Sequence, residues 1–554
     1  MKYILIVIVL LGSVFRLWGL SENPPHLTSD EAALGYNAYS ILKTGRDEHG
    51  ELFPIVFKSF GDWKPGLYVY LTVPFVATLG LTELAVRLPA AIAGVSAIVL
   101  LFLITHQLFD NKKVALFASF FLAISPWHIQ FSRGAWEAGI ALTLTLLGIY
   151  FFLLVVKGRP RMLIVAGLFF ALTLWTYQGA KLATAVVGLG LLICFWKELS
   201  KVSLKILGKS LAIGFLVALP VLVGFWQGKT GRLEVYSIFS YRRPEDYVQA
   251  ILGQERVSRD SWQYILYHSE SLNFVRGILG RWFNYYSGRF LFFDGDWTNP
   301  RHAVPNSGNL LIIDSIMLVL GLFALSRVGA KKEALFVWFW IIFAPLPAAL
   351  SRDSVHAIRT LNMVIPLTIL LALGANAVWD QRKRVGKLLP VLLVVFSGIY
   401  IANYVYYLDQ YWIHGPKRNS KYWQYGYKQM VEKLTPLQQK YDEIVVIQDY
   451  TQPYIFFLFY QKYDPVKYQG MVSQVYMPNK YGDVGLVSGL DNITFRDINW
   501  QDDRGMVGKL FVVDPIRVPI VDSSSPAEFK LVDQVNYLNG DVAFRILEIL
   551  GEKR

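Results

Sequence analysis

The sequence predicts a polytopic α-helical membrane protein with a small C-terminal α/β domain outside the bilayer. Of its 554 residues, 54% are hydrophobic and 15% are aromatic, and the mean hydropathy is +0.37. Apolar runs of about 17 to 25 residues recur, and each is long enough to cross the roughly 30 Å hydrocarbon core of a bilayer. We therefore expect about eleven membrane spans in residues 1–407 and a separate α/β domain in residues 408–554.

One apolar run is not expected to cross. Gly66–Gly80 (GLYVYLTVPFVATLG) is short for a span and contains Pro74, so we expect an interfacial or re-entrant helix on the outside. Ile4–Leu20 lacks a small-residue cleavage site, so we expect a first span that stays in the protein. The expected spans are residues 4–20, 87–108, 114–126, 138–156, 162–178, 180–196, 207–226, 309–326, 334–350, 361–379 and 388–407.

The positive charges predict the orientation of these spans. Lys and Arg cluster in short loops, which is typical of the cytoplasmic side. With the N-terminus inside, the clusters fall at every second loop, and the long segments 21–86, 227–307 and 408–554 fall outside. The net charge of +13 is thus explained without nucleic-acid binding. The clusters are Lys112 with Lys113; Lys157, Arg159 and Arg161; Lys197, Lys201 and Lys205; Arg327, Lys331 and Lys332; and Arg382, Lys383, Arg384 and Lys387.

The C-terminal segment has the pattern of a small α/β domain. YDEIVVIQD and GKLFVVDP resemble buried strands, and PYIFFLFYQKYDP between them has helical spacing. FKLVDQVNYLNGDVAFRILEIL places an Asn-Gly turn between two strand-like runs. The single cysteine, Cys194, lies in an expected span, which excludes an intrachain disulfide and a multi-thiolate metal site.

Two adjacent carboxylates, Asp30 and Glu31, follow the first expected span in TSDEAALGYNAYSILKTG (28–45). Thr28 and Glu31 fit a capping box, acidic residues suit the first turn of a helix, and Gly45 suits its end. A structural role alone would explain Glu31 well and Asp30 less well. Asp30 is therefore a candidate for chemistry at the membrane edge.

Many other ionisable residues are expected on the same outer face, close to the ends of spans. Such groups often only extend toward water, but near hydrocarbon they also tend to pair or to serve a site. Carboxylates beside cations suit a lipid phosphate substrate, because the cations hold phosphate and a carboxylate accepts a hydroxyl proton. The residues are Asp30, Glu31, Lys64, Arg87, Arg133, Glu137, Lys181, Asp294, Asp296, Arg301, His302, His356 and Arg359.

Five segments, in order, resemble the GT-C glycosyltransferase superfamily. Its most similar branch holds the protein O-mannosyltransferases and the lipid A aminoarabinose transferases. Together the segments cover roughly the first 360 residues. They are Asp30-Glu31, WKPGLY (63–68), ELAVRLPAAIAG (83–94), FFDGDWTNPRHAVPNSGNLL (292–311) and DSVHAIRTL (353–361).

This resemblance implies roles for individual residues. Asp30 matches the proposed catalytic base, and Glu31 is expected to support it. Lys64 and Arg87 match residues that contact the lipid phosphate, although this chain has Lys-Pro-Gly where the family has Lys-Pro-Pro. The resemblance also implies that Arg359 binds the donor phosphate. Other contacts with the substrates are expected from Asp296, Arg301, His302 and His356. Some relatives hold a divalent metal near the site, but the sequence identifies no ligand set.

We therefore expect an inverting glycosyltransferase of the cytoplasmic membrane that uses a polyprenyl-phosphate monosaccharide on its outer face. The sugar cannot be read from the sequence, and the acceptor hydroxyl can belong to a protein, a lipid or a glycan. The alternative is a transporter or flippase for a lipid-linked or acidic solute. Against it, the expected span centres carry almost no charge and the two halves of the chain are unlike.

Overall fold

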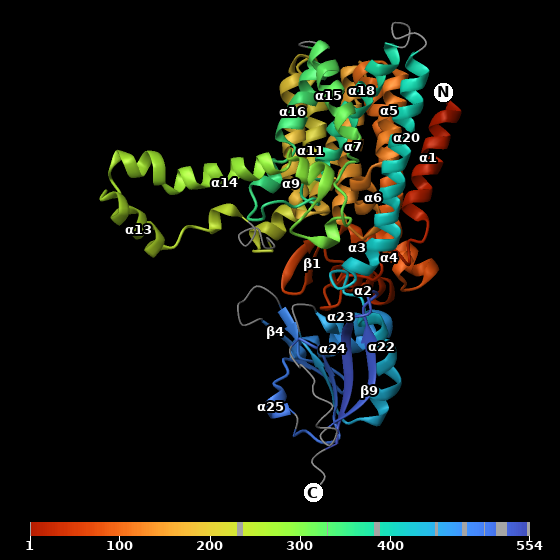
Figure 1. The fold of residues 1–554 in the computed structure, drawn as a ribbon, viewed down its shortest axis with the longest axis vertical. Coiled ribbons are helices and arrows are strands. Elements are labelled where there is room, and N and C mark those ends of the chain that lie inside the picture. Colours follow the sequence, from red (N-terminus) through yellow and green to blue (C-terminus); the bar gives the residue numbers. More distant parts are fainter. Residues whose placement is uncertain are drawn as a thin grey trace.

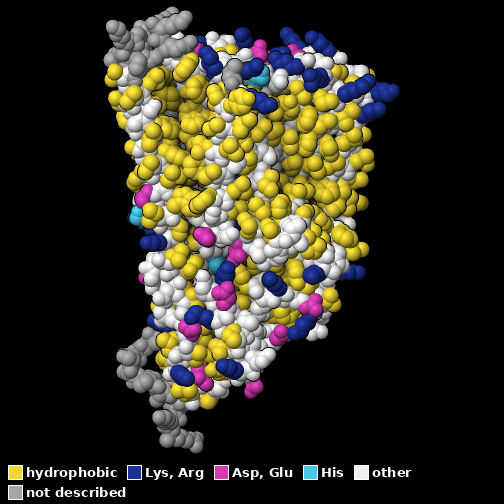
Figure 2. Space-filling model, turned by 90° about the vertical axis from the view of Figure 1, so that its right-hand side faces the viewer, with side chains coloured by type: hydrophobic (Ala, Val, Ile, Leu, Met, Phe, Trp, Pro, Cys, Tyr) yellow, Lys and Arg dark blue, Asp and Glu magenta, His cyan; other side chains and the backbone are white. Residues whose placement is uncertain are grey.

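A computed structural model describes residues 2–229, 237–328, 331–381, 388–448, 452–478, 485–503, 505–516 and 529–550. A helical bundle forms one end of the molecule and a sheet with flanking helices forms the other (Figure 1). Figure 2 shows a band of hydrophobic side chains over the bundle, with Lys and Arg gathered at the end opposite the sheet. This is the surface of a membrane-embedded bundle, and the chain is a polytopic α-helical membrane protein.

Long apolar helices form the bundle. Six described helices are long and apolar enough to cross a bilayer, or seven if the bent pair α5 and α6 is one span. The pair bends by 56° where Pro126 begins the second helix. The helices are α1 (Lys2–Leu17), α4 (Glu83–Phe109), α5 (Lys112–Ile124), α6 (Pro126–Arg133), α7 (Glu137–Val156), α8 (Met162–Leu172), α9 (Gln178–Cys194), α10 (Trp196–Leu199), α11 (Leu204–Trp226), α15 (Asp314–Arg327), α16 (Lys332–Phe343), α17 (Leu346–Ala349), α18 (Val364–Asp380) and α20 (Leu388–Asp409).

Several expected spans form shorter helices than their apolar runs suggest. The run at 162–178 ends in a 3₁₀ turn, η1 (Thr173–Trp175), and the run at 361–379 begins with one, η6 (Leu361–Met363). The eleven crossings therefore stay a prediction, as does the orientation. The last basic cluster, residues 382–387, lies outside the described residues.

The segment between α1 and α4 folds into two helices and a hairpin. Helix α2 (Ser29–Thr44) leads to the antiparallel strands β1 (Val56–Ser59) and β2 (Asp62–Pro65), and α3 (Leu67–Leu79) follows. Helix α3 packs against α2 and α4. It has the short length predicted for the run at 66–80, while its depth in the membrane stays a prediction.

The segment after α11 leaves the bundle sideways as an arm (Figure 1). It returns to the bundle through two short turns that carry several of the predicted site residues. The arm contains η2 (Ile238–Ser240), α13 (Glu245–Glu255), η3 (Tyr264–His268) and α14 (Glu270–Asn284), and the return contains η4 (Arg289–Phe293) and η5 (Pro300–His302).

The C-terminal segment forms a six-stranded mixed sheet in the order β6-β7-β3-β8-β10-β9. Strand β3 (Ile444–Ile447) is parallel to both β7 (Ile493–Arg496) and β8 (Leu510–Val513), and its residues are all buried. Strands β9 (Phe529–Asn536) and β10 (Val542–Ile549) form the hairpin that the Asn-Gly pattern predicts. The other elements are η7 (Gln410–His414), α21 (Gly415–Asn419), α22 (Tyr427–Leu434), η8 (Thr435–Lys440), α23 (Pro453–Tyr460), α24 (Pro465–Val475), α25 (Trp500–Asp503), β4 (Tyr476–Pro478), β5 (Gly485–Val487) and β6 (Gly489–Leu490).

The C-terminal segment packs directly on the segment between α1 and α4. Helix α23 lies against α2, and their hydrophobic side chains belong to one buried core. A Cβ atom on Gly35 would lie 2.6 Å from the Phe459 ring, so only glycine permits this approach. The Lys428 ammonium also pairs with Glu83 at 2.8 Å. Although a division at residue 408 stays a prediction, the sheet is firmly joined to the segment that carries Asp30.

Candidate active site

The capping box predicted at the start of α2 is confirmed. The Thr28 backbone N–H donates to Glu31 Oε2 at 2.9 Å, and the Glu31 backbone N–H donates to the Thr28 hydroxyl at 3.3 Å. The helix ends at Gly45, whose φ of 69° is in the left-handed region that glycine adopts at little cost. Asp30 thus sits in a rigid first turn.

Glu31 and Arg87 form a buried ion pair behind that turn. Arg87 Nε donates to Glu31 Oε1 at 3.0 Å, and the Ala135 backbone N–H donates to the same oxygen at 2.9 Å. The remaining Arg87 bonds go to the carbonyl oxygens of Leu20, Pro24 and His26, at 2.6 to 3.1 Å. Because Arg87 has no exposed surface, a direct contact with lipid phosphate stays a prediction, and this conformation gives it protein partners instead.

Asp30 and Lys64 form a second ion pair, which faces outward. The side chain of Asp30 is 49% exposed and that of Lys64 is 24% exposed. Lys64 lies on β2 opposite Phe57 of β1, so the hairpin sets its position. Burial would lower the pKa of Lys64, but the carboxylates of Asp30 and Glu137 outweigh it and the pKa is raised. Lys64 therefore remains an ammonium ion at any working pH.

Three further polar residues lie around this pair: Glu137 and Lys181, which the sequence predicts on the same face, and Gln178. Glu137 begins α7 and acts on Lys64 electrostatically. Gln178, at the start of α9, donates from Nε2 to the Trp63 carbonyl at 3.2 Å and pairs with Lys181. Glu137 and Lys181 share one feature in the sequence: each is a charged residue in the first turn of an apolar run.

Arg359 lines a small cavity close to the residues around Lys64. It pairs with Asp353 at 2.6 Å and lines a cavity of about 30 Å³ together with Ala138 and Tyr177. Because Ala138 follows Glu137 and Tyr177 precedes Gln178, this cavity adjoins the residues around Lys64. Arg359 thus remains a candidate for the donor phosphate.

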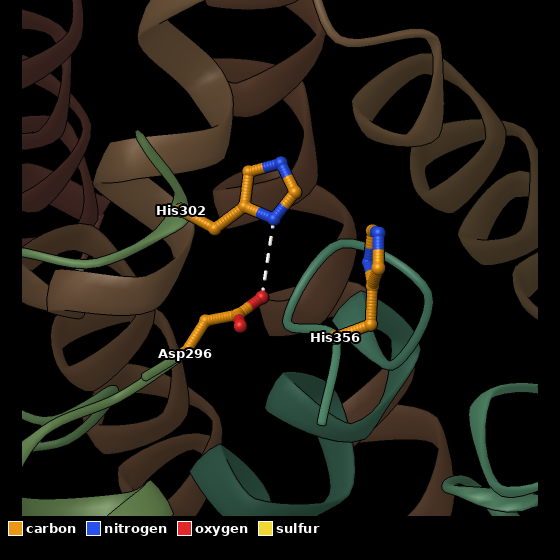
Figure 3. A group of neighbouring side chains, drawn as sticks. All are labelled: Asp296, His302 and His356. Atoms are coloured by element: carbon orange, nitrogen blue, oxygen red, sulfur yellow. Dashed lines mark hydrogen bonds and ion pairs between the residues drawn. The ribbon is translucent and has the colours of Figure 1, made fainter. Parts of the chain in front are cut away.

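Asp296, His302 and His356 come together in a cluster in which Asp296 and His302 are buried and His356 is partly buried (Figure 3). His302 Nδ1 donates to Asp296 Oδ2 at 3.1 Å, and the two imidazole rings lie 4.9 Å apart. Burial lowers the pKa of His302 although Asp296 opposes it, so this imidazole is neutral at pH 7. The Arg301 carbonyl accepts a hydrogen bond from Gln130 at 2.6 Å, which ties the cluster to α6.

Trp136 joins this cluster to the Asp30–Lys64 pair. Its ring lies 5.3 Å from that of His302 and 6.0 Å from the Arg301 guanidinium. The next residue is Glu137, which acts on Lys64. The predicted residues therefore form two linked groups, one facing outward at Asp30 and one buried behind Trp136.

An apolar groove of about 290 Å³ runs between α3, α4 and α7. Leu71 and Phe75 line it on α3, Ile92 lines it on α4, and Ile140 and Leu144 line it on α7. Two of its walls begin beside the polar site, because α3 follows Lys64 closely and α7 starts at Glu137. The apolar lining of this groove suits a hydrocarbon chain.

Comparison with protein families and solved structures gives one family match and several structural matches. Residues 64–224 match the model of the dolichyl-phosphate-mannose-protein mannosyltransferase family. That segment begins at Lys64 and contains Arg87, Glu137 and the groove residues. No curated protein matches the chain.

The structural matches extend over most of the chain. ArnT from Cupriavidus metallidurans bound to undecaprenyl phosphate is 12% identical with a TM-score of 0.54, and 98% of this chain and 97% of that chain are covered. The oligosaccharyltransferase of Archaeoglobus fulgidus, in complex with Zn and sulfate, is 14% identical with a TM-score of 0.50, covering 82% and 61%. At these identities the likeness is one of fold. The chain thus resembles the GT-C membrane glycosyltransferases, and among them the branch of the protein O-mannosyltransferases and ArnT, as its motifs predict.

Proposed function

We propose that this protein is a glycosyltransferase that moves a monosaccharide from a polyprenyl-phosphate donor to a hydroxyl acceptor on the outer face of the cytoplasmic membrane. The observation that carries the proposal is the outward-facing Asp30–Lys64 pair on a capped helix, beside an apolar groove. The groove suits the polyprenyl chain, and the permanently charged Lys64 suits its phosphate. The family match and the fold shared with ArnT support the same donor class.

The ion pair has a part in the proposed reaction. In the free protein Lys64 neutralises Asp30; donor phosphate competes for Lys64 and releases the Asp30 carboxylate beside Glu137. The acceptor oxygen then forms a bond to the anomeric carbon while the bond from that carbon to the phosphate oxygen breaks. Asp30 takes the hydroxyl proton, and the phosphate leaves with the electron pair and is stabilised by Lys64. Attack opposite the leaving group inverts the configuration.

Glu31 and Arg87 hold this arrangement in place. Their buried pair connects the first turn of α2 to α4 and to the segment before Glu137. We assign them positioning roles and Arg359 a contact with the donor phosphate. The acceptor hydroxyl belongs to a protein, a lipid or a glycan.

A transfer assay tests the proposal. Purified protein in lipid vesicles is given a panel of radiolabelled polyprenyl-phosphate sugars with peptide, lipid and glycan acceptors. We expect transfer from one donor, and a large loss for Lys64→Ala but not for Lys433→Ala, whose lysine pairs with Asp533 on the C-terminal sheet. Movement of donor across the vesicle without transfer to any acceptor would favour a transporter instead.

A further inference from the structure

The cluster of Asp296, His302 and His356 brings together three side chains of the types that bind metal ions. The three residues come from two segments that are more than fifty residues apart in sequence. Figure 3 shows the Asp296 carboxylate facing His302, with the His356 ring beside them. One candidate ligand atom from each residue lies within 4.8 Å of the others. Two imidazoles and one carboxylate are a ligand set that Zn²⁺ and related divalent ions bind.

The separation of two of these atoms already fits a metal. Tetrahedral bonds of about 2.0 Å place neighbouring ligand atoms about 3.3 Å apart. His302 Nδ1 and Asp296 Oδ2 are 3.1 Å apart. A metal between them replaces their hydrogen bond, and the neutral imidazole carries its proton on Nε2 instead.

His356 supplies the third ligand and an independent observation. Its Nδ1 is buried and has no hydrogen-bond partner among the described residues. Leaving such an atom unpaired costs about 1–3 kcal/mol. Rotation of the His356 ring toward Asp296 and His302 would give this atom a partner in the metal.

The surroundings hold the carboxylate in place. Asp296 also accepts hydrogen bonds from the Ala357 backbone N–H and the Thr298 hydroxyl, both at 2.8 Å. Such outer contacts orient metal ligands. The nearby Arg359 would repel a cation, but it pairs with Asp353 at 2.6 Å.

We propose that Asp296, His302 and His356 bind one divalent transition-metal ion, with Zn²⁺ as the best match to this ligand set. The ion would join the loop that carries Arg301 to the loop that carries Arg359. Three protein ligands leave a fourth position for water or a substrate oxygen. This inference does not depend on the transferase activity.

Metal analysis tests the site directly. Full-length protein is purified without a polyhistidine tag, treated with chelator and equilibrated with Zn²⁺, and bound metal is measured by mass spectrometry. We expect one Zn²⁺ per chain, a rise in melting temperature on adding Zn²⁺, and visible absorption bands when Co²⁺ replaces it.

His356→Gln is the informative variant because the side-chain Nδ1 that it removes has no hydrogen-bond partner among the residues that the structure describes. We expect its metal-free melting temperature to equal that of the parent, its Zn²⁺ affinity to fall at least about tenfold, and its Co²⁺ bands to vanish. His268→Gln, which changes a histidine beside Glu255 on the arm, should bind like the parent. Equal Zn²⁺ binding by the parent and His356→Gln, or none by either, would overturn the proposal.

Discussion

Glu31 is the residue whose charge matters most for the fold around the site. Glu31→Gln leaves the guanidinium of Arg87 buried without its anion, which commonly costs about 3–5 kcal/mol. We expect a clear fall in the melting temperature in detergent. Glu245→Gln breaks an exposed pair with Arg259 and should leave the melting temperature nearly unchanged. If both variants melt alike, the positioning role of Glu31 is wrong.

Glu48 gives stability a pH dependence. It is fully buried, and burial raises its pKa from 4.5 to about 8, although Asn37 and Lys64 oppose the shift. Between these values the folded state holds a proton that the unfolded state has lost. Stability therefore falls by about 1.4 kcal/mol per pH unit as the pH rises from 4.5 to 8.

Glu48→Gln removes this titration but keeps the oxygen that accepts a hydrogen bond from Asn37 at 3.2 Å. We expect the variant to melt above the parent at pH 8 and to lose this advantage near pH 4.5. Melting curves at several pH values provide the measurement. A difference that does not change with pH would contradict the buried, protonated state of Glu48.

At the scale of elements, the β1–β2 hairpin explains why this chain has Lys-Pro-Gly where relatives have Lys-Pro-Pro. The Gly66 N–H donates to the Ile55 carbonyl at 2.8 Å. A Cβ atom on Gly66 would lie 2.2 Å from the ring of Phe57, which is the cross-strand neighbour of Lys64. A side chain here must displace Phe57 and with it Lys64.

Gly66→Ala should therefore lower transfer about tenfold to a hundredfold, because small misplacements of catalytic groups have effects of this size. Gly253→Ala is the matched control, since a Cβ on Gly253 of α13 meets no atom within 4 Å. Steady-state transfer rates of the two variants provide the measurement. Normal transfer by Gly66→Ala would show that the hairpin does not set the position of Lys64.

Local patterns predicted some elements well and others poorly. The capping box and the Asn-Gly hairpin follow from short motifs whose geometry is fixed by neighbouring residues. Hydropathy gave the apolar runs, but it did not reveal the bend at Pro126 or the sideways arm, because both depend on packing between distant segments.

The residues of the site were also predicted only in part. Asp30 and Lys64 were both predicted, and the structure pairs them. The three backbone carbonyls that bind Arg87 were not predicted, because only the folded loop places them around its guanidinium. The contact between His302 and His356 was not predicted either, because more than fifty residues separate them in the sequence.

At the scale of the whole molecule, the orientation in the membrane decides which face the site serves. In a Cys194→Ala background, we expect Asn539→Cys to react with an impermeant thiol reagent on intact cells and Arg159→Cys to react only after permeabilisation. Both positions are exposed, so both are accessible to the reagent. The reverse pattern would place Asp30 on the cytoplasmic face.

The central claim is that Asp30 accepts the proton of the acceptor hydroxyl. Asp30→Asn keeps the shape of the side chain but removes this capacity. Asp533→Asn is the matched control, because Asp533 also pairs with a lysine but lies on the C-terminal sheet.

The decisive measurement is the single-turnover rate of sugar transfer from saturating polyprenyl-phosphate donor by these two variants. We predict that Asp30→Asn binds donor and melts like the parent but transfers about 10²–10⁴-fold more slowly, while Asp533→Asn transfers at the parent rate. Transfer by Asp30→Asn at the parent rate would contradict the assignment of Asp30 as the base.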